Sequence, residues 1–246
     1  MIVANWKCNG SKAMINEWTN NFLINYVEMK KAFIGIAPPS IYIESILDTK
    51  LSKFEEINIG SQDIDISSGA RTGAISSEMI LDFDCKFSII GHSESREFLG
   101  ETNEDIFDKY SQLIKHSIKP IICIGESSKV REDNLFSAFI TEQLELFKDV
   151  EDELIIAYEP IWAIGSGVIP DLKDIQETHN VINYHLKEIY PNSDYLPRIV
   201  YGGSVDNSNI DSIMSLKNVD GVLVGSASLD CKKFCDIVLS VGKQND

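Results

Sequence analysis

Residues 154–167 read Leu-Ile-Ile-Ala-Tyr-Glu-Pro-Ile-Trp-Ala-Ile-Gly-Ser-Gly, and this stretch guides the interpretation of the whole chain. The apolar run 154–157 predicts a buried strand, which Pro160 ends because proline fixes φ and lacks an N–H. The Gly-Ser-Gly at 165–167 permits backbone angles that other residues resist, which is typical of a mobile loop. The strand therefore delivers the carboxylate of Glu159 beside a loop that can close, as suits a general base shielded from water. A glutamate that merely caps a helix or pairs with a lysine is the alternative.

Other short apolar runs follow the same scheme, and longer segments with helical periodicity connect them. Near-continuous apolar character is expected of strands buried on both faces of a parallel sheet. The predicted strands are Ile2–Trp6, Phe33–Ala37, Ile57–Ser61, Phe87–Gly91, Ile121–Gly125, Leu154–Glu159, Ile199–Gly202 and Val222–Gly225. Helical spacing relates Ile15, Trp18, Phe22 and Tyr26, then Ile175, His179, Ile182 and Leu186, and also Ile210, Ile213 and Met214; further helices are predicted in 102–116 and 134–147.

This alternation predicts an α/β protein with one (β/α)8 barrel domain over residues 1–246. Barrels of this kind commonly have about 250 residues, and the chain has no linker-like tract that would separate two domains. An open, doubly wound sheet with two additional strands is the alternative.

Composition limits the partners and the compartment. The net charge is −16, which argues against nucleic acid or an anionic membrane as a partner, so an anionic substrate needs a locally positive site. We see neither a signal peptide nor an apolar run of about 18 residues, and we expect a cytoplasmic protein. The five widely spaced cysteines fit free thiols in a reducing compartment. A metal site at Cys231 and Cys235 is a minor alternative, because no histidine lies near them.

In a (β/α)8 barrel the chemistry lies at the carboxyl ends of the strands. These ends deliver a base, an imidazole, a cation and glycine-containing turns, a combination that packing alone explains poorly. In strand order they are Asn5 and Lys7; His92, Ser93 and Glu94; Cys123 and Glu126; Glu159; Tyr201, Gly202, Gly203 and Ser204; and Gly225 and Ser226.

Each of these residues has a plain structural alternative when it is taken alone. Lys7 fits a solvated lysine, and His92 fits a structural histidine. Ser93 can cap a helix, and the start of a helix disfavours imidazolium, so we expect His92 to stay neutral from about pH 5 upward and to donate a hydrogen bond. Glycines after the last two strands lie where barrels commonly bind phosphate.

Six segments resemble the triosephosphate isomerase family, in the order in which that family has them. They are Asn5-Trp6-Lys7, Gly91-His92-Ser93-Glu94, Cys123-Ile124-Gly125-Glu126, Ala157-Tyr158-Glu159-Pro160 with Trp162-Ala163-Ile164-Gly165, Tyr201-Gly202-Gly203-Ser204-Val205 and Leu223-Val224-Gly225. The resemblance implies a TIM-barrel homodimer that interconverts dihydroxyacetone phosphate and glyceraldehyde 3-phosphate without a metal or an organic cofactor.

The resemblance also implies a role for each matching residue. Glu159 is the base, His92 the neutral electrophile and Lys7 the positive charge, with Asn5 positioning Lys7 and donating to the substrate. Phosphate binds to Gly165, Ser204, Gly225 and Ser226, and residues 160–168 form a lid that keeps water from the enediolate. Glu94 holds Lys7, and Ser93, Cys123, Glu126, Trp162 and Tyr201 support the site.

The chain departs from the family pattern at several positions, and the loop 69–74 lacks the aromatic residue that the family usually has before Thr72-Gly73. Ala74 and Ser95 replace a Glu–Arg ion pair of the family's dimer interface. Because both partners are lost together, the cost is far smaller than the roughly 3–5 kcal/mol of one unpaired buried charge. Val168 stands where the lid usually carries Lys, and Ser226 stands where the phosphate turn usually has Gly. Ser226 still offers its N–H, provided that the turn does not need a positive φ.

The residues themselves agree with this assignment. Proton abstraction beside a carbonyl needs a base, a donor to the oxygen and exclusion of water, and no hydride acceptor. No dinucleotide-binding fingerprint or P-loop is present. A different phosphate-handling barrel enzyme would need a Schiff-base lysine near the sixth strand or metal ligands, neither of which is evident. A non-catalytic barrel would be expected to have lost Glu159, His92 or Lys7.

Overall fold

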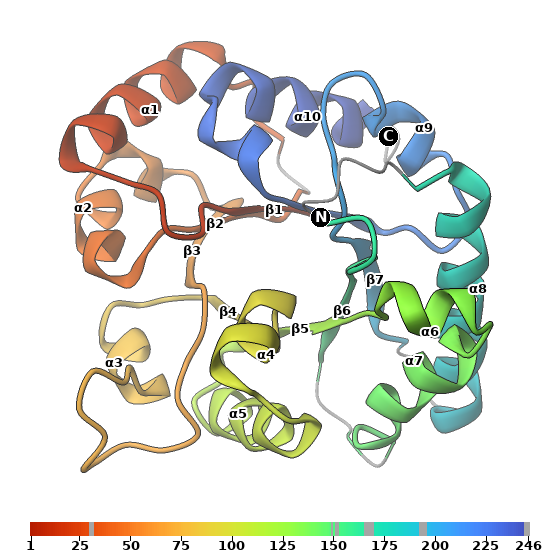
Figure 1. The fold of residues 1–246 in the computed structure, drawn as a ribbon. Coiled ribbons are helices and arrows are strands. Elements are labelled where there is room, and N and C mark those ends of the chain that lie inside the picture. Colours follow the sequence, from red (N-terminus) through yellow and green to blue (C-terminus); the bar gives the residue numbers. More distant parts are fainter. Residues whose placement is uncertain (30–31, 149, 151–152, 165–169, 192–195, 244–246) are drawn as a thin grey trace.

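The structure is a computed structural model, and it describes residues 1–29, 32–148, 150, 153–164, 170–191 and 196–243. Eight parallel strands form a closed barrel in chain order, with helices around it (Figure 1). The strands are β1 (Ile2–Asn5), β2 (Ile34–Ala37), β3 (Ile57–Ser61), β4 (Phe87–Ile90), β5 (Lys119–Ile124), β6 (Ile155–Tyr158), β7 (Arg198–Tyr201) and β8 (Gly221–Val224). The barrel predicted from the sequence is therefore confirmed, and the open sheet is wrong.

Helices connect successive strands. The α-helices are α1 (Lys12–Asn25), α2 (Ile43–Leu47), α3 (Ser77–Asp82), α4 (Ser93–Leu99), α5 (Asn103–Lys115), α6 (Ser128–Glu132), α7 (Phe136–Glu145), α8 (Leu172–Ile189), α9 (Ile210–Met214) and α10 (Cys231–Lys243). Short 3-10 turns are η1 (Ser40–Tyr42), η2 (Lys50–Lys53) and η3 (Ser226–Leu229). In the described part of the chain, no helix is long and apolar enough to cross a bilayer.

The strands are mostly apolar because they separate two cores. Side chains that point into the barrel include Val3, Ile89 and Cys123, whereas their neighbours Ala4, Ile90 and Ile124 pack outward against the helices. Successive side chains of a strand point to opposite faces, so seven of the strands contribute to both cores, whereas β3 contributes Ile57 and Ile59 to the outer core only. This double burial explains why the sequence shows continuous apolar runs.

The interior of the barrel is filled at one end by the ring of Phe87. A Cβ atom at Gly60 would lie 2.6 Å from this ring, and one at Gly35 would lie 2.9 Å from it. The two strand glycines therefore leave the space that the ring occupies, and Phe33 packs against the ring at a centroid distance of 5.8 Å.

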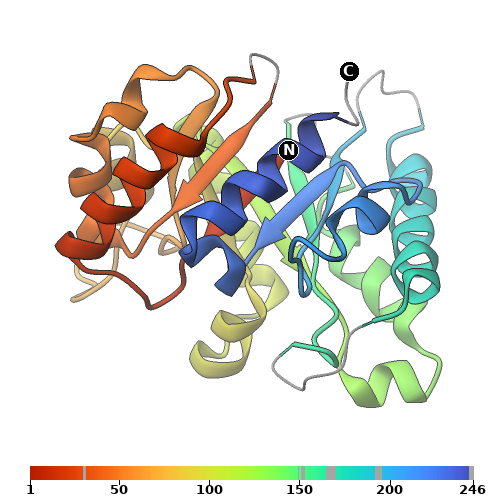
Figure 2. The same ribbon diagram turned by 90° about the horizontal axis from the view of Figure 1, so that it is seen from above.

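The first and last helices, α1 and α10, lie side by side, and α10 packs against β1 (Figure 2). Trp18 of α1 packs on Phe234 of α10 at a centroid distance of 5.8 Å, and its indole N–H donates to the carbonyl of Ser228 at 3.0 Å. The predicted helices omit α10, although Phe234, Ile237, Val238 and Val241 recur at helical spacing and are all buried. This packing fixes the start of α10 beside the ends of the strands.

Candidate active site

A cavity of about 550 Å³ opens at the carboxyl ends of the strands. It is lined by residues from the ends of β1, β4, β6, β7 and β8, which are far apart in the sequence. The predicted residues among them are Asn5, Lys7, His92, Glu159, Ser204, Gly225 and Ser226. The remaining predicted phosphate ligand, Gly165, lies outside the described residues, as do Ser166 to Val168 of the predicted lid.

Glu159 is held by backbone and side-chain contacts. Its N–H donates to the carbonyl of Ile124 at 2.8 Å, which places it one residue beyond the last residue of β6. Its Oε1 lies 2.9 Å from Nε2 of His92, and its Oε2 accepts from the N–H of Ser93 at 2.9 Å. Glu159 is only 2% exposed. The predicted base and the predicted electrophile therefore face each other across one hydrogen bond.

His92 itself caps helix α4. Its Nδ1 accepts from the N–H of Glu94 at 3.2 Å, so that the helix begins at Ser93 and the predicted Ser93 cap is wrong. Because Nδ1 is an acceptor, the neutral ring carries its proton on Nε2, opposite Glu159. Burial lowers the pKa of His92, but the charge and hydrogen bond of Glu159 outweigh burial and raise it above its usual value. This shift works against the expected neutral ring from about pH 5 upward while Glu159 lies this close.

Lys7 occupies a strained position at the end of β1. Its φ of 49° lies in the left-handed region, which is uncommon for residues other than glycine. Its N–H donates to Oδ1 of Asn5 at 3.0 Å, and the amide of Gln62 donates to its carbonyl at 2.9 Å. Its Nζ lies 2.7 Å from Oε1 of Glu94. The predicted positioning of Lys7 by Asn5 and Glu94 therefore matches these contacts.

The end of the cavity where phosphate is predicted to bind is formed by the turns after β7 and β8. Gly225 precedes η3, and its carbonyl accepts from the N–H of Ser228 at 2.9 Å and from its hydroxyl at 2.6 Å. Ser226 does not have a positive φ, unlike five other described non-glycine residues. This turn therefore accommodates serine without strain. Ser204 lines the same end. These turns can therefore present backbone N–H groups to an anion.

Behind the cavity, Glu126 anchors the segment that follows Glu159. It is fully buried, and its Oε1 accepts from the hydroxyl of Tyr158 at 3.0 Å and from the indole N–H of Trp162 at 2.9 Å. Burial raises the pKa of Glu126, which these donors partly oppose. Arg131 lies 3.6 Å from the same carboxylate. Glu126 and Trp162 thus support the site without lining the cavity.

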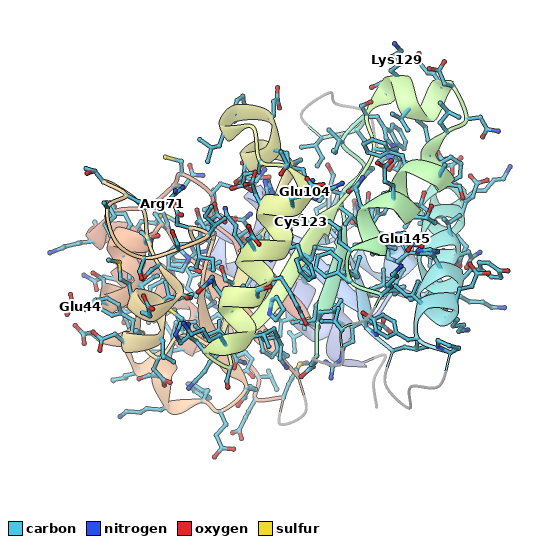
Figure 3. The ribbon with its side chains drawn as sticks, turned by 90° about the horizontal axis from the view of Figure 1, so that it is seen from below. Glu44, Arg71, Glu104, Cys123, Lys129 and Glu145 are labelled. Carbon is cyan, nitrogen blue, oxygen red and sulfur yellow. The ribbon has the colours of Figure 1, made fainter. Side chains whose placement is uncertain are left out.

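Cys123 and Tyr201 lie within the packed interior. Cys123 points into the barrel, near the middle of the molecule in Figure 3, whereas Lys129 and Glu44 extend into solvent. Burial raises the pKa of the Cys123 thiol well above its usual range. Tyr201 packs outward beside Tyr158. Both residues shape the site from behind.

Three residues of this region were not among the predicted site residues. Gln62 donates to the carbonyls of Lys7 and Ala37, both at 2.9 Å. Arg96 donates to the carbonyls of Gly91 and Cys123 at 2.8 and 3.0 Å. Lys233 lines the cavity from α10. Gln62 follows β3 directly, so its place at a strand end is a signal in the sequence, whereas Lys233 comes from a helix that was not predicted.

Comparisons with known proteins agree with this geometry. The sequence profile described as triosephosphate isomerase matches residues 1–241. The triosephosphate isomerase of Francisella philomiragia subsp. philomiragia is 40% identical over 250 residues, covering 99% of this chain and 97% of the relative. That of Shewanella amazonensis is 36% identical over 254 residues, covering 98% and 97%.

Proposed function

The chain belongs to the triosephosphate isomerase family, and we propose that Glu159 and His92 carry out the proton transfers of its reaction. The enzyme interconverts dihydroxyacetone phosphate and glyceraldehyde 3-phosphate, a step of glycolysis and gluconeogenesis. The observation that carries the assignment of roles is the 2.9 Å contact between Glu159 and His92 in the cavity wall.

Glu159 removes a proton from C1 of dihydroxyacetone phosphate and returns it to C2 of the enediolate. The neutral imidazole of His92 donates from Nε2 to the oxygen on which negative charge develops. This division of roles is the one for which the triosephosphate isomerase family is itself the standard example. The substrate must enter between the two groups, and their contact is replaced by contacts to C1 and to the carbonyl oxygen.

Lys7 supplies positive charge to the phosphate and to the developing enediolate. Its ion pair with Glu94 and the Asn5 contact hold it in the cavity, which supports this role. The N–H groups after β7 and β8, with the Ser204 hydroxyl and with Gly165, bind the phosphate. The predicted lid begins at Pro160, and the Trp162–Glu126 hydrogen bond anchors its described part. Closure keeps water from the enediolate and prevents loss of phosphate.

We propose that the protein is a cytoplasmic homodimer. The connection between β3 and α3 extends away from the barrel (Figure 1), and an ion pair of 2.5 Å between Arg71 and Asp65 braces it. Close by, α4 exposes Phe98 at 74% and Leu99 at 72%, an apolar surface suited to a second copy. In this arrangement the partner's loop covers Lys7 and its neighbours, so the monomer has little activity.

The test of the catalytic roles is Glu159→Gln, with Glu97→Gln as the control, because Glu97 is an exposed carboxylate of α4. Glu159→Gln removes the base and should lower kcat by about 10²–10⁴ and suppress deuterium incorporation from solvent into the product. Glu97→Gln should leave both unchanged. A Glu159→Gln enzyme with half of the wild-type kcat would exclude Glu159 as the base.

A further inference from the structure

Two lysines line the cavity in the described part of the chain, and they differ in their partners. Lys7 is paired with Glu94 at 2.7 Å, whereas Lys233 has no ion pair among the described residues. Lys233 lies in the first turn of α10 and shares the cavity wall with Ser204, Gly225 and Ser226. An unpaired cation therefore stands at the phosphate end of the site.

The position of Lys233 is unfavourable for the helix that carries it. The first turn of α10 contains no acidic residue, and a positive charge there opposes the helix dipole by about 0.3–1 kcal/mol. Asp230, just before the helix, offsets part of this cost by accepting from the N–H groups of Lys232 and Lys233 at 3.0 and 3.1 Å. Local rules of this kind are most often broken at functional sites.

Other charges around the cavity make this cation useful. The chain carries a net charge of −16, so its overall field repels a phosphorylated substrate. Asp206, the acidic residue that lines the cavity beside Ser204, is engaged by Ser208, whose N–H and hydroxyl donate to it at 2.8 and 2.6 Å. Hydrogen bonds from Ser208 and, to a smaller extent, the charge of Lys233 lower the pKa of Asp206. No ion pair joins Asp206 and Lys233 among the described residues, so the Lys233 ammonium can still bind an anion.

We propose that Lys233 is a second cation for the substrate phosphate, which attracts the dianion into the cavity and binds it with Lys7 and the turns after β7 and β8. The proposal rests on the isomerase assignment and extends it to a residue outside the strand ends. Because Lys233 acts on the phosphate and not on the reacting carbons, it stabilises substrate and transition state alike, and its loss raises KM with little change in kcat.

Lys232 provides a matched control. It is the neighbour of Lys233 on α10 and is also exposed, but it lines a different groove toward α1, together with Glu17 and Asn21. Lys233→Met and Lys232→Met change the net charge equally and remove the same dipole conflict. Both should leave the melting temperature unchanged or slightly raised. Only the Lys233 variant should weaken the binding of phosphate.

The experiment measures KM for glyceraldehyde 3-phosphate, kcat, and the affinity of the intact enzyme for inorganic phosphate by calorimetry. At an ionic strength of about 0.01 M, Lys233→Met should raise KM and the Kd of phosphate about three- to tenfold, and at about 1 M the effect should fall below about twofold. Lys233→Arg should restore most of the loss. Equal effects of the Lys233 and Lys232 variants, or a change confined to kcat, would overturn the proposal. The affinity for phosphate tests the role of Lys233 independently of whether Glu159 is the base.

Discussion

Gly125→Ala tests whether the position of Glu159 sets the reaction rate, without touching the carboxylate. Gly125 follows β5 directly, and its backbone N–H and carbonyl are both bound by the amide of Gln143, at 3.1 and 3.0 Å. A Cβ atom at this position would lie 1.9 Å from the carbonyl oxygen of Glu159. No rotamer relieves this overlap, because the carbonyl oxygen is a backbone atom and the backbone fixes the position of the Cβ atom.

The overlap gives the size of the displacement. Separating the two atoms from 1.9 Å to an ordinary contact of 3.4 Å requires a shift of about 1.5 Å between residue 125 and Glu159. A misplacement of about 1 Å at a catalytic group can cost 10²-fold in rate, so kcat should fall by about 10²-fold or more. KM should change less, because the phosphate turns belong to β7 and β8.

The assay compares steady-state kinetics of Gly125→Ala with those of Gly35→Ala. A Cβ at Gly35 would lie 2.9 Å from the Phe87 ring inside the barrel, so this control also strains the core but leaves the base in place. Gly202→Ala, whose Cβ would lie 3.1 Å from Cγ of Glu159, adds a milder step. A folded Gly125→Ala enzyme with a kcat within threefold of the control would refute the reasoning.

Further predictions concern stability and assembly. Trp162→Phe removes a hydrogen bond to the buried Glu126 carboxylate and should lower the free energy of urea unfolding by about 1–3 kcal/mol, whereas an unchanged value would mean that this contact contributes nothing. Burial raises the pKa of Asp63 to about 7. The folded chain then keeps a proton that the unfolded chain loses near pH 4, so stability should fall between about pH 4 and pH 7, and Asp63→Asn should flatten that slope in urea titrations. Because Ala74 and Ser95 replace the family's Glu–Arg pair at the proposed dimer interface, sedimentation across a dilution series should give a dimer Kd that changes little with salt; steep dissociation at high salt would contradict this.

The sequence predicts the barrel because the physical cause is local and repeated. Each strand is buried on both faces, and this leaves a continuous apolar run that ends at a polar residue or a glycine, as at Tyr158–Glu159 and Val224–Gly225. All predicted strands are present with ends within two residues. Since the carboxyl ends of parallel strands meet at one rim, the strand order alone brings Lys7, His92 and Glu159 into one cavity.

Features of the site that depend on contacts between distant segments follow only from the tertiary structure. The cap of α4 is His92 itself, because the turn after β4 directs Nδ1 toward the N–H of Glu94, and a pattern of residue types does not specify that geometry. The direction of its pKa shift depends on the balance between burial and a carboxylate 67 residues away in sequence, and only the folded distance sets that balance.

Contacts between distant segments also explain why the sequence did not single out Lys233. In the sequence it is one of two adjacent lysines at the start of a late helix, and nothing distinguishes it from Lys232. The packing of α10 against α1 and the barrel turns one toward the phosphate end and the other toward a separate groove. The fold and the candidate reacting groups can be predicted from the sequence, because strand periodicity and strand order are properties of the chain. Which lysine of α10 faces the cavity depends on the orientation of the helix, and that orientation follows from tertiary packing.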